Sequence, residues 1–190
     1  PAGGLSVVLS DDPLLIVDKP AGLVVHSASP LVTGCLLDLV VERFGPPALP
    51  CHRIDRFTSG LVVIARDAPA ARRLQRAFLE HEVSKTYLAL VRGRVTEPGG
   101  IALPLGPDPG SAIVGKQAVR PDGKRAFTEY RPLAVYDDCT LLEVRLHTGR
   151  KHQIRAHFAH AGFPVVRDKL YGPEVDWTYY DPTVRARPAY

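Results

Sequence analysis

The sequence predicts a soluble fold in which short β-strands are combined with a few helices. Runs of β-branched and apolar residues bounded by Gly, Pro or Asp recur along the chain and predict strands, as at residues 61–65. Three other stretches repeat apolar residues at helical spacing. With 190 residues, of which 45% are hydrophobic and 23% charged, the chain can form one domain, or two closely joined halves, with a substantial core.

The N-terminal part is expected to open with two strands and a helix. Strands are predicted at residues 5–9 and 14–18, on either side of a Ser-Asp-Asp-Pro turn. Pro20 and Gly22 predict a second turn, followed by a short extended piece. Residues 32–44 repeat apolar side chains at helical spacing and are followed by two prolines, so a helix is predicted to end there.

The middle of the chain predicts a strand, a helix and a second strand. After the buried strand at 61–65, Asp67 is a good N-cap and Pro69 fits the first turn of a helix. Residues 84–93 then alternate as a strand does. One face of that strand carries Thr86, Leu88 and Leu90, and the other carries Lys85, Tyr87, Ala89 and Val91.

The C-terminal part is expected to contain a long loop, an antiparallel pair and a last helix. Residues 97–123 are rich in Pro and Gly and predict a loop with short extended pieces. The phrase at 123–131 leads into a strand, and residues 140–146 supply its antiparallel neighbour. Thr148 is expected to cap the helix that follows, and Gly162 to end it.

The stretch HRIDRFTSG, before the central buried strand, is unusual for a turn. Asp55 stands between Arg53 and Arg56, with His52 close by and the hydroxyl of Thr58 downstream. Nearby guanidiniums favour the ionised carboxylate. An anion held beside a buried strand in a basic setting can act as a nucleophile or base. An ion pair that only caps the end of the strand would leave the same pattern.

Composition narrows the class of partner and the kind of site. The net charge is +4, and 18 of the 24 basic residues are Arg. This bias suits a polyanion partner, and it is equally what a GC-rich genome would produce. The three cysteines are far apart and give no disulfide framework or zinc motif. Since the sequence shows neither a membrane-spanning apolar run nor a signal-peptide pattern, a cytoplasmic setting is expected.

A second basic stretch lies where the last helix is expected to begin. Its first turns would present Arg150, Lys151, His152 and Arg155 at the positive end of the helix dipole, a natural site for phosphate or carboxylate. The nearby histidines do not follow HExxH spacing, and no carboxylate separates them. No metal site is therefore expected.

Three of these stretches, in this order, resemble the signatures of the RluA-type RNA pseudouridine synthases. HRIDRFTSG is similar to that family's HRLDxxTSG signature, KTYLALVRG to its KxYxAlvxG motif, and HTGRKHQIRAH to its xTGRxHQIRxH signature. The opening phrase DKPAGLVVH and the later GKRAFTEYR are also similar to family phrases. The matches span residues 14–172, which is most of the chain.

The resemblance implies isomerisation of a uridine in RNA to pseudouridine, with no cofactor, metal or ATP required. Asp55 would be the essential carboxylate, Tyr87 would pack against the base, and Arg155 would pair with Asp55. Because the target base must leave its stack, Arg53 is expected to fill the vacated space. The remaining residues expected to contact RNA are His52, Thr58, Lys85, Arg150, His152 and Ile154.

The fold implied is α+β. The family has a long, mostly antiparallel mixed sheet in two halves, flanked by helices and loops, with the active site in a central cleft. A single catalytic domain over residues 1–190 is therefore expected. The expected partner is ribosomal or transfer RNA, with no role for DNA or membrane, and the expected state is a monomer.

Three features depart from the family pattern. Arg167 stands where the family's ilGDxxYG phrase has a small residue, so the backbone geometry there is expected to differ. The chain starts directly with the catalytic part, and no N-terminal S4 RNA-binding domain is expected. It also stops before an expected LHAxxL…HP strand, so either a C-terminal strand is missing or the sheet closes differently.

Two other classes of function compete with the isomerase. A glycosidase needs two carboxylates flanking a sugar bond, whereas these stretches offer one carboxylate among cations. A catalytically silent RNA-binding module of the same fold would keep the basic residues but could dispense with Asp55. The presence of Asp55 together with Tyr87 and Arg155 favours the isomerase.

Overall fold

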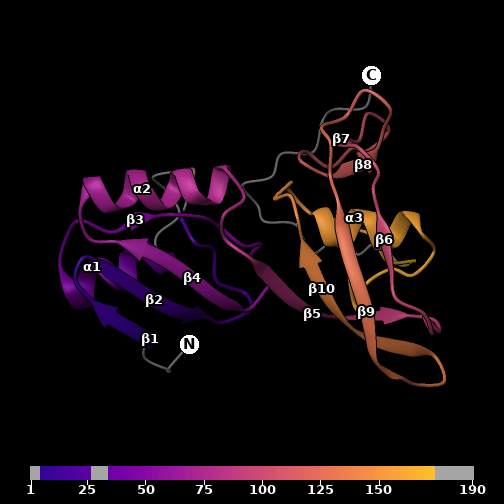
Figure 1. Ribbon diagram of the computed structural model, residues 1–190, viewed down its shortest axis with the longest axis horizontal. Coiled ribbons are helices and arrows are strands. Elements are labelled where there is room, and N and C mark those ends of the chain that lie inside the picture. Colours follow the sequence, from indigo (N-terminus) through magenta and orange to yellow (C-terminus); the bar gives the residue numbers. More distant parts are fainter. Residues whose placement is uncertain (1–4, 27–33, 174–190) are drawn as a thin grey trace. The chain divides into compact units, whose positions relative to one another are not determined.

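The computed structural model describes residues 5–26 and 34–173 and divides the chain into two compact units, with the boundary between Val83 and Ser84 (Figure 1). Each unit has its own four-stranded antiparallel sheet and its own apolar core. Within the described residues, three helices accompany the sheets. The predicted α+β class is confirmed, and every strand pair in the described part of the chain is antiparallel.

The sheet of the first unit has the strand order β1-β2-β4-β3. Its strands are β1 (Ser6–Asp11), β2 (Leu14–Lys19), β3 (Leu49–Pro50) and β4 (Gly60–Ala65). The predicted strands at residues 5–9, 14–18 and 61–65 are therefore confirmed within a residue or two. The register of β2 on β4 runs from the Leu14–Ala65 pair to the Lys19–Gly60 pair, which places the start of β4 beside the end of β2.

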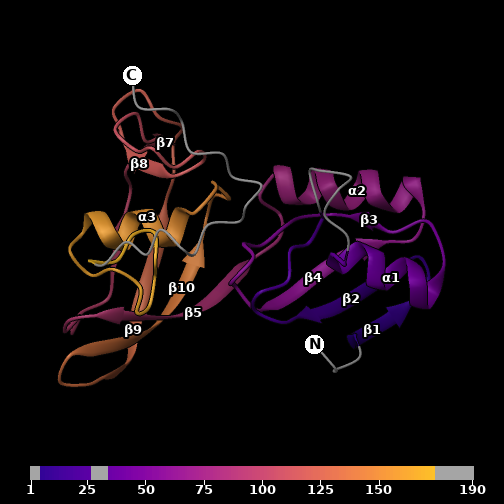
Figure 2. The ribbon, with the colours of Figure 1, turned by 180° about the vertical axis from the view of Figure 1, so that it is seen from behind.

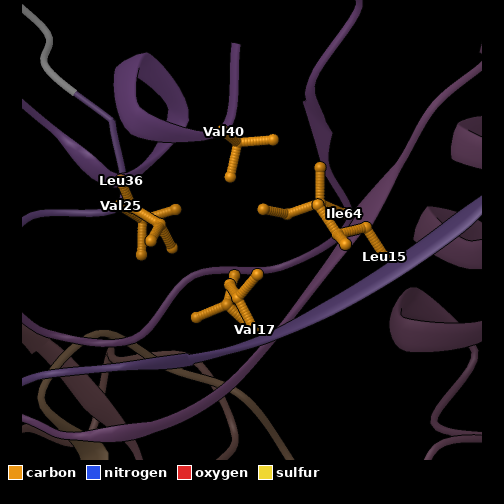
Figure 3. Packing of buried hydrophobic residues seen from close by; sticks show 7 residues of the cluster. Leu15, Val17, Val25, Leu36, Val40 and Ile64 are labelled. Carbon is orange, nitrogen blue, oxygen red and sulfur yellow. The ribbon is translucent and has the colours of Figure 1, made fainter. Parts of the chain in front are cut away.

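Alternation along the central strands separates two apolar faces. Leu15, Val17 and Ile64 point to one face, where Leu36 and Val40 of α1 (Leu36–Phe44) close the core (Figure 3). Ala65 belongs to a second cluster, which α2 (Ala68–Leu79) covers with its small residues Ala70 and Ala71. The predicted cap of α2 is confirmed, because the Asp67 carboxylate accepts the Ala70 N–H at 2.6 Å.

The segment after Gly22 differs from the prediction of a short extended strand. It joins no sheet; instead the carbonyls of Val24 and Val25 accept the N–H groups of Leu36 and Leu37 at 2.9 and 3.1 Å. The first N–H groups of a helix have no acceptor within the helix, and this segment supplies acceptors for two of these N–H groups. Helix α1 begins at Leu36, and residues 32 and 33 of the predicted helix lie outside the described part.

The sheet of the second unit has the strand order β5-β10-β9-β6. Its strands are β5 (Lys85–Arg92), β6 (Gly99–Ile101), β9 (Thr128–Val135) and β10 (Cys139–Leu146). The predicted antiparallel pair is β9 with β10. The Pro- and Gly-rich stretch contains the predicted short extended pieces, namely β6 and the separate hairpin β7 (Leu105–Pro107) and β8 (Gln117–Val119).

Helix α3 (Gln153–His160) packs on one face of this sheet (Figure 2). Phe158 is 1% exposed and lies in one cluster with Val91, Leu142 and Val144. The predicted alternation of β5 is confirmed: Val91 is fully buried, whereas Leu88 on the other face is 70% exposed. The core of the second unit therefore lies on the Tyr87 side of β5.

The expected cap of α3 by Thr148 is wrong. The N-cap is His152, whose backbone is left-handed with φ of 54°. The Thr148 hydroxyl instead donates to Oε1 of Gln153 at 2.8 Å and accepts the Phe127 N–H at 3.0 Å. Because the helix starts at Gln153, Arg150 lies in the turn that precedes it.

Arg167 adopts a left-handed backbone with φ of 60°. It follows a segment that extends the edge of β5, where the Val166 N–H donates to the Leu90 carbonyl at 2.8 Å. The left-handed region strains any residue with a β-carbon, and glycine enters it freely. Arg167 therefore adopts the backbone conformation that would suit the small residue of the family phrase.

We predict that Arg167→Gly raises the free energy of unfolding by about 0.5–1 kcal/mol, because it removes left-handed strain of about 1–2 kcal/mol and adds some entropy to the unfolded chain. Urea denaturation measures the difference. The matched control is Arg92→Gly in β5, where a glycine should cost about 0.5–1 kcal/mol. A loss at residue 167 as large as that at residue 92 would contradict the prediction.

Candidate active site

Asp55 begins a tight turn in the first unit. The Thr58 N–H donates to the Asp55 carbonyl at 3.1 Å, which closes a four-residue turn with Arg56 and Phe57 at its centre. Ile54, directly before the turn, packs against the apolar core. Asp55 is half-buried. Its carboxylate is thus carried by a backbone that is anchored on both sides.

Lys19 fastens this turn from inside the protein. Its side chain is fully buried, and its ammonium donates to the carbonyls of Pro20, Leu23 and Arg56 at 2.9, 2.8 and 3.0 Å. The Arg56 carbonyl also accepts the Gly22 N–H at 2.8 Å, and the Arg56 guanidinium donates to the Gly22 carbonyl at 3.0 Å. The turn that carries Asp55 is therefore tied to the turn that follows β2.

The burial of Lys19 changes its acid–base behaviour. Burial lowers the pKa of Lys19 from 10.5 to about 8, and the negative charge of Asp55 opposes this shift. The Asp55 carboxylate therefore acts on Lys19 as a nearby negative charge that favours the ammonium form. Sequence reasoning missed Lys19. The available signal was a lysine in phase with the buried Leu15 and Val17 of the same strand.

We predict that Lys19→Met lowers the free energy of unfolding by about 2–3 kcal/mol, because three buried carbonyls lose their donor. The deficit should widen between pH 8 and pH 10.5. In that window the unfolded wild-type chain still binds the Lys19 proton that the folded protein releases, so wild-type stability rises with pH and the variant lacks this term.

Denaturant titrations of wild type and Lys19→Met at several pH values test this. Lys124→Met, at an exposed lysine of the second unit, is the control and should follow wild type at every pH. A wild-type advantage over Lys19→Met that stays constant with pH would contradict the proposed proton linkage.

His52 and Arg53 have different surroundings. His52 Nε2 accepts the Val63 N–H at 3.1 Å, and its ring stacks on Phe78 of α2 with centroids 4.4 Å apart. Arg53 is exposed and has no hydrogen bond or ion pair to any residue of the described segments. His52 therefore helps to hold the loop on β4 and α2, whereas Arg53 extends outward beside Asp55.

In the second unit, Lys85 and Tyr87 lie on the core side of β5 and are half-buried. Burial lowers the pKa of Lys85. The pairing of Lys85 with Leu146 brings the start of β5 to the end of β10, next to the turn that contains Gly149. Two of the predicted family motifs are thus adjacent in space within this unit.

Arg155 has a partner that the sequence did not predict. Its Nε and Nη2 donate to the two carboxylate oxygens of Asp168 at 2.7 and 2.9 Å. The guanidinium also lies over the ring of Tyr171, 5.1 Å from its centroid. The expected pairing of Arg155 with Asp55 joins residues of different units and stays a prediction. The signal for Asp168 was its place in the phrase similar to GDxxYG.

The other predicted residues of the second unit surround the start of α3. The Arg150 guanidinium donates to the Arg125 carbonyl at 3.0 Å, and His152 Nδ1 shares a hydrogen bond of 3.0 Å with the Tyr171 hydroxyl. Ile154 is half-buried and packs against the core of the unit. These contacts of Arg150, His152 and Ile154 are thus contacts within the protein, and that of Ile154 is core packing. Their expected contacts with RNA stay predictions.

Comparison with known proteins identifies the family. The family model described as RNA pseudouridylate synthase matches residues 13–160. The chain belongs to this family. It is 45% identical over 163 residues to an uncharacterized RNA pseudouridine synthase of Chloroflexus aurantiacus, with 82% of this chain and 51% of the relative covered. It is 40% identical over 173 residues to the ribosomal large subunit pseudouridine synthase D of Xanthomonas campestris, with 88% and 52% covered.

Solved structures agree with this assignment. Human RNA pseudouridylate synthase domain containing 1 is similar with a TM-score of 0.79 at 29% identity, over 90% of this chain and 72% of that one. Human RNA pseudouridylate synthase domain containing 4 gives 0.71 at 27% identity, over 97% and 73%. The chain spans about half the length of the curated relatives it matches.

A buried polar network holds the HQIR segment of this family member. The Gln153 amide donates to the Thr128 hydroxyl at 2.9 Å, and its oxygen accepts the Arg150 N–H at 3.0 Å. His157 Nε2 must donate to the Leu103 carbonyl at 2.9 Å, so its Nδ1 accepts from the Thr128 hydroxyl at the same distance. His157 is fully buried, and burial lowers its pKa. Sequence reasoning missed Gln153.

We predict that the free energy of unfolding falls as the pH drops below about 6.5. In that range His157 binds a proton in the unfolded chain but stays neutral in the folded protein. His157→Phe, which cannot titrate, should lose this component and show a shallower decline between pH 7 and pH 5. Thermal unfolding against pH measures it. Phe158→Leu, a core substitution in the same helix that removes no titrating group, is the control and should keep the wild-type slope.

No group of three or more His, Cys, Asp or Glu side chains in residues 5–26 and 34–173 could hold a metal ion. Within the same ranges, no helix has the length and apolar character needed to cross a membrane. The cysteines Cys35, Cys51 and Cys139 are free thiols.

Proposed function

We propose that this chain isomerises uridines in structured RNA to pseudouridine, with Asp55 as the essential carboxylate. Family membership supports the reaction class. The observation that carries the assignment to Asp55 is its clamped turn: the carboxylate sits on a backbone fixed by Thr58 and by the buried Lys19. A carboxylate that must meet one atom of a bound nucleotide gains from such prior fixation.

The reaction is balanced within the substrate. The N1–C1′ bond breaks, the uracil rotates, and C5 bonds to C1′; the proton leaves C5 and another is taken up at N1. Asp55 acts as the covalent nucleophile or as the base that removes a proton. Because no electron or group leaves the nucleotide, the proposed reaction needs no cofactor.

The flipped target base needs a replacement in the stack. Arg53 supports this role because it is exposed, next but one to Asp55, and without a bond to any described residue that would have to break first. A planar guanidinium can stack where a base has left.

We propose that the face of the second unit that carries Tyr87 binds the target uracil and the adjoining RNA backbone. Tyr87 offers a half-buried ring at the rim of the core, and Lys85 and Arg150 offer cations on neighbouring segments. In the proposal Arg155 pairs with Asp55, and His152 and Thr58 contact the RNA. Ribosomal RNA is the first substrate to test, since several relatives are named ribosomal large subunit pseudouridine synthase D; transfer RNA is the alternative. The chain is proposed to act as a cytoplasmic monomer.

We predict that the chain releases tritium from RNA labelled at C5 of uridine, and that Asp55→Asn lowers the rate by about 10³-fold or more. Asparagine keeps the shape of the side chain and removes the nucleophile and base. Ribosomal and transfer RNA are assayed separately, so that the substrate class is read from the same experiment.

The matched control is Asp18→Asn, at an exposed carboxylate of β2, which should release tritium at the wild-type rate. Thermal unfolding checks that both variants are folded. If wild type and Asp55→Asn bind RNA equally and neither releases tritium, the protein is a silent RNA-binding module. Equal release by both would remove Asp55 from the mechanism.

A further inference from the structure

The segment after α3 encloses the end of the Arg155 side chain. The Asp168 carboxylate accepts hydrogen bonds from Nε–H and Nη2–H of the guanidinium, at 2.7 and 2.9 Å. The Asp168 side chain is 3% exposed and that of Arg155 21%. Two parallel hydrogen bonds between planar groups set the plane of the guanidinium and its rotation in that plane.

Asp168 is itself held in place. One of its carboxylate oxygens accepts the N–H groups of Leu170 and Tyr171 at 2.9 and 3.1 Å. Burial by itself would raise the pKa of Asp168, but the bond and charge of Arg155, with these two amides, bring it below its ordinary value. The carboxylate therefore stays charged and has little freedom to turn.

Tyr171 fixes the guanidinium from a third direction. Its ring centroid is 5.1 Å from the guanidinium carbon of Arg155. Its hydroxyl accepts the Gln117 N–H of β8 at 2.8 Å and shares a hydrogen bond with His152 Nδ1 at 3.0 Å. The ring is thus anchored to the β7–β8 hairpin and to the cap of α3, and it gives Arg155 a rigid surface to lie on.

We propose that Asp168 and Tyr171 are positioning residues that hold the Arg155 guanidinium in one orientation for the isomerisation of uridine. This inference rests on the proposed function. The bidentate bond and the ring determine where the other N–H groups of Arg155 point before RNA arrives. The ordering of a long, flexible side chain is then complete before the reaction starts.

The central variant is Asp168→Asn. Asparagine keeps an oxygen for the amides of Leu170 and Tyr171 but loses the charge and the second acceptor for Arg155. We predict that kcat for tritium release falls about 10²-fold while KM for RNA changes little, because a misplaced reacting group affects the chemical step. A general loss of folded protein would instead lower the active concentration and the measured melting temperature.

The matched control is Glu143→Gln, which breaks an exposed bidentate pair with Arg131 on the opposite face of the sheet. It should leave kcat unchanged. Arg155→Met provides a double-variant cycle: if Asp168 acts only through Arg155, then adding Asp168→Asn to Arg155→Met lowers kcat no further. The double variant also removes both charges, so no unpaired buried carboxylate is left to unfold it.

A second readout does not depend on catalysis. In protein labelled with ¹⁵N-arginine, the Nε–H signal of Arg155, assigned by its loss in Arg155→Met, should exchange slowly with water. Asp168→Asn should speed this exchange about tenfold or more, since a charge-assisted hydrogen bond is lost, and Glu143→Gln should leave it unchanged.

The outcomes separate the two proposals. Unchanged exchange in Asp168→Asn, an unchanged kcat, or an equal further loss of kcat in the Arg155→Met background would each overturn the positioning role. A wild-type chain that releases no tritium, yet whose Arg155 signal responds to Asp168→Asn, would overturn the proposed function, and the positioning role in that reaction with it, while showing that the contact itself is real.

Discussion

The Lys19 ammonium, enclosed by three backbone carbonyls, is the interaction on which the first unit's part of the site depends. A buried charge is costly unless hydrogen bonds surround it. Here the three partners lie in the turn after β2 and in the turn that carries the proposed catalytic carboxylate. The negative charge of Asp55 in turn favours the protonated Lys19. Fold stability and the chemistry of the site are therefore coupled at one side chain, which explains why the lysine can occupy a core position at the end of an apolar strand.

The second unit obtains rigidity by other means. Antiparallel pairing of β5 with β10 brings two motifs together, and the core behind them is closed by Phe158 of α3. The start of α3 is then held by neutral groups, since Gln153 and His157 form a network whose donors and acceptors are matched. A charged group inside it would need a counterion that the network does not offer.

Carboxylates in the two units have different surroundings. Asp168 is nearly inaccessible, ligated by Arg155 and two amides, and suits a permanent structural anion. Asp55 is half-buried on a turn, two residues after the exposed Arg53. This difference in burial is the reason that we propose a catalytic role for Asp55 and a positioning role for Asp168.

The sequence by itself determined the α+β class, the strands and helices with strong periodicity, and the family, because alternation, capping residues and the three signatures are local properties. It also placed Asp55, Tyr87 and Arg155 as candidates. The tertiary structure alone decided the partners of these residues. Lys19 donates to a carbonyl 37 positions away, and Arg155 binds Asp168, which follows the end of α3. Thr148 donates to Gln153 and does not cap the helix. Such contacts join segments that are distant in the chain or compete with a local preference, and no pattern of neighbouring residues encodes which partner prevails.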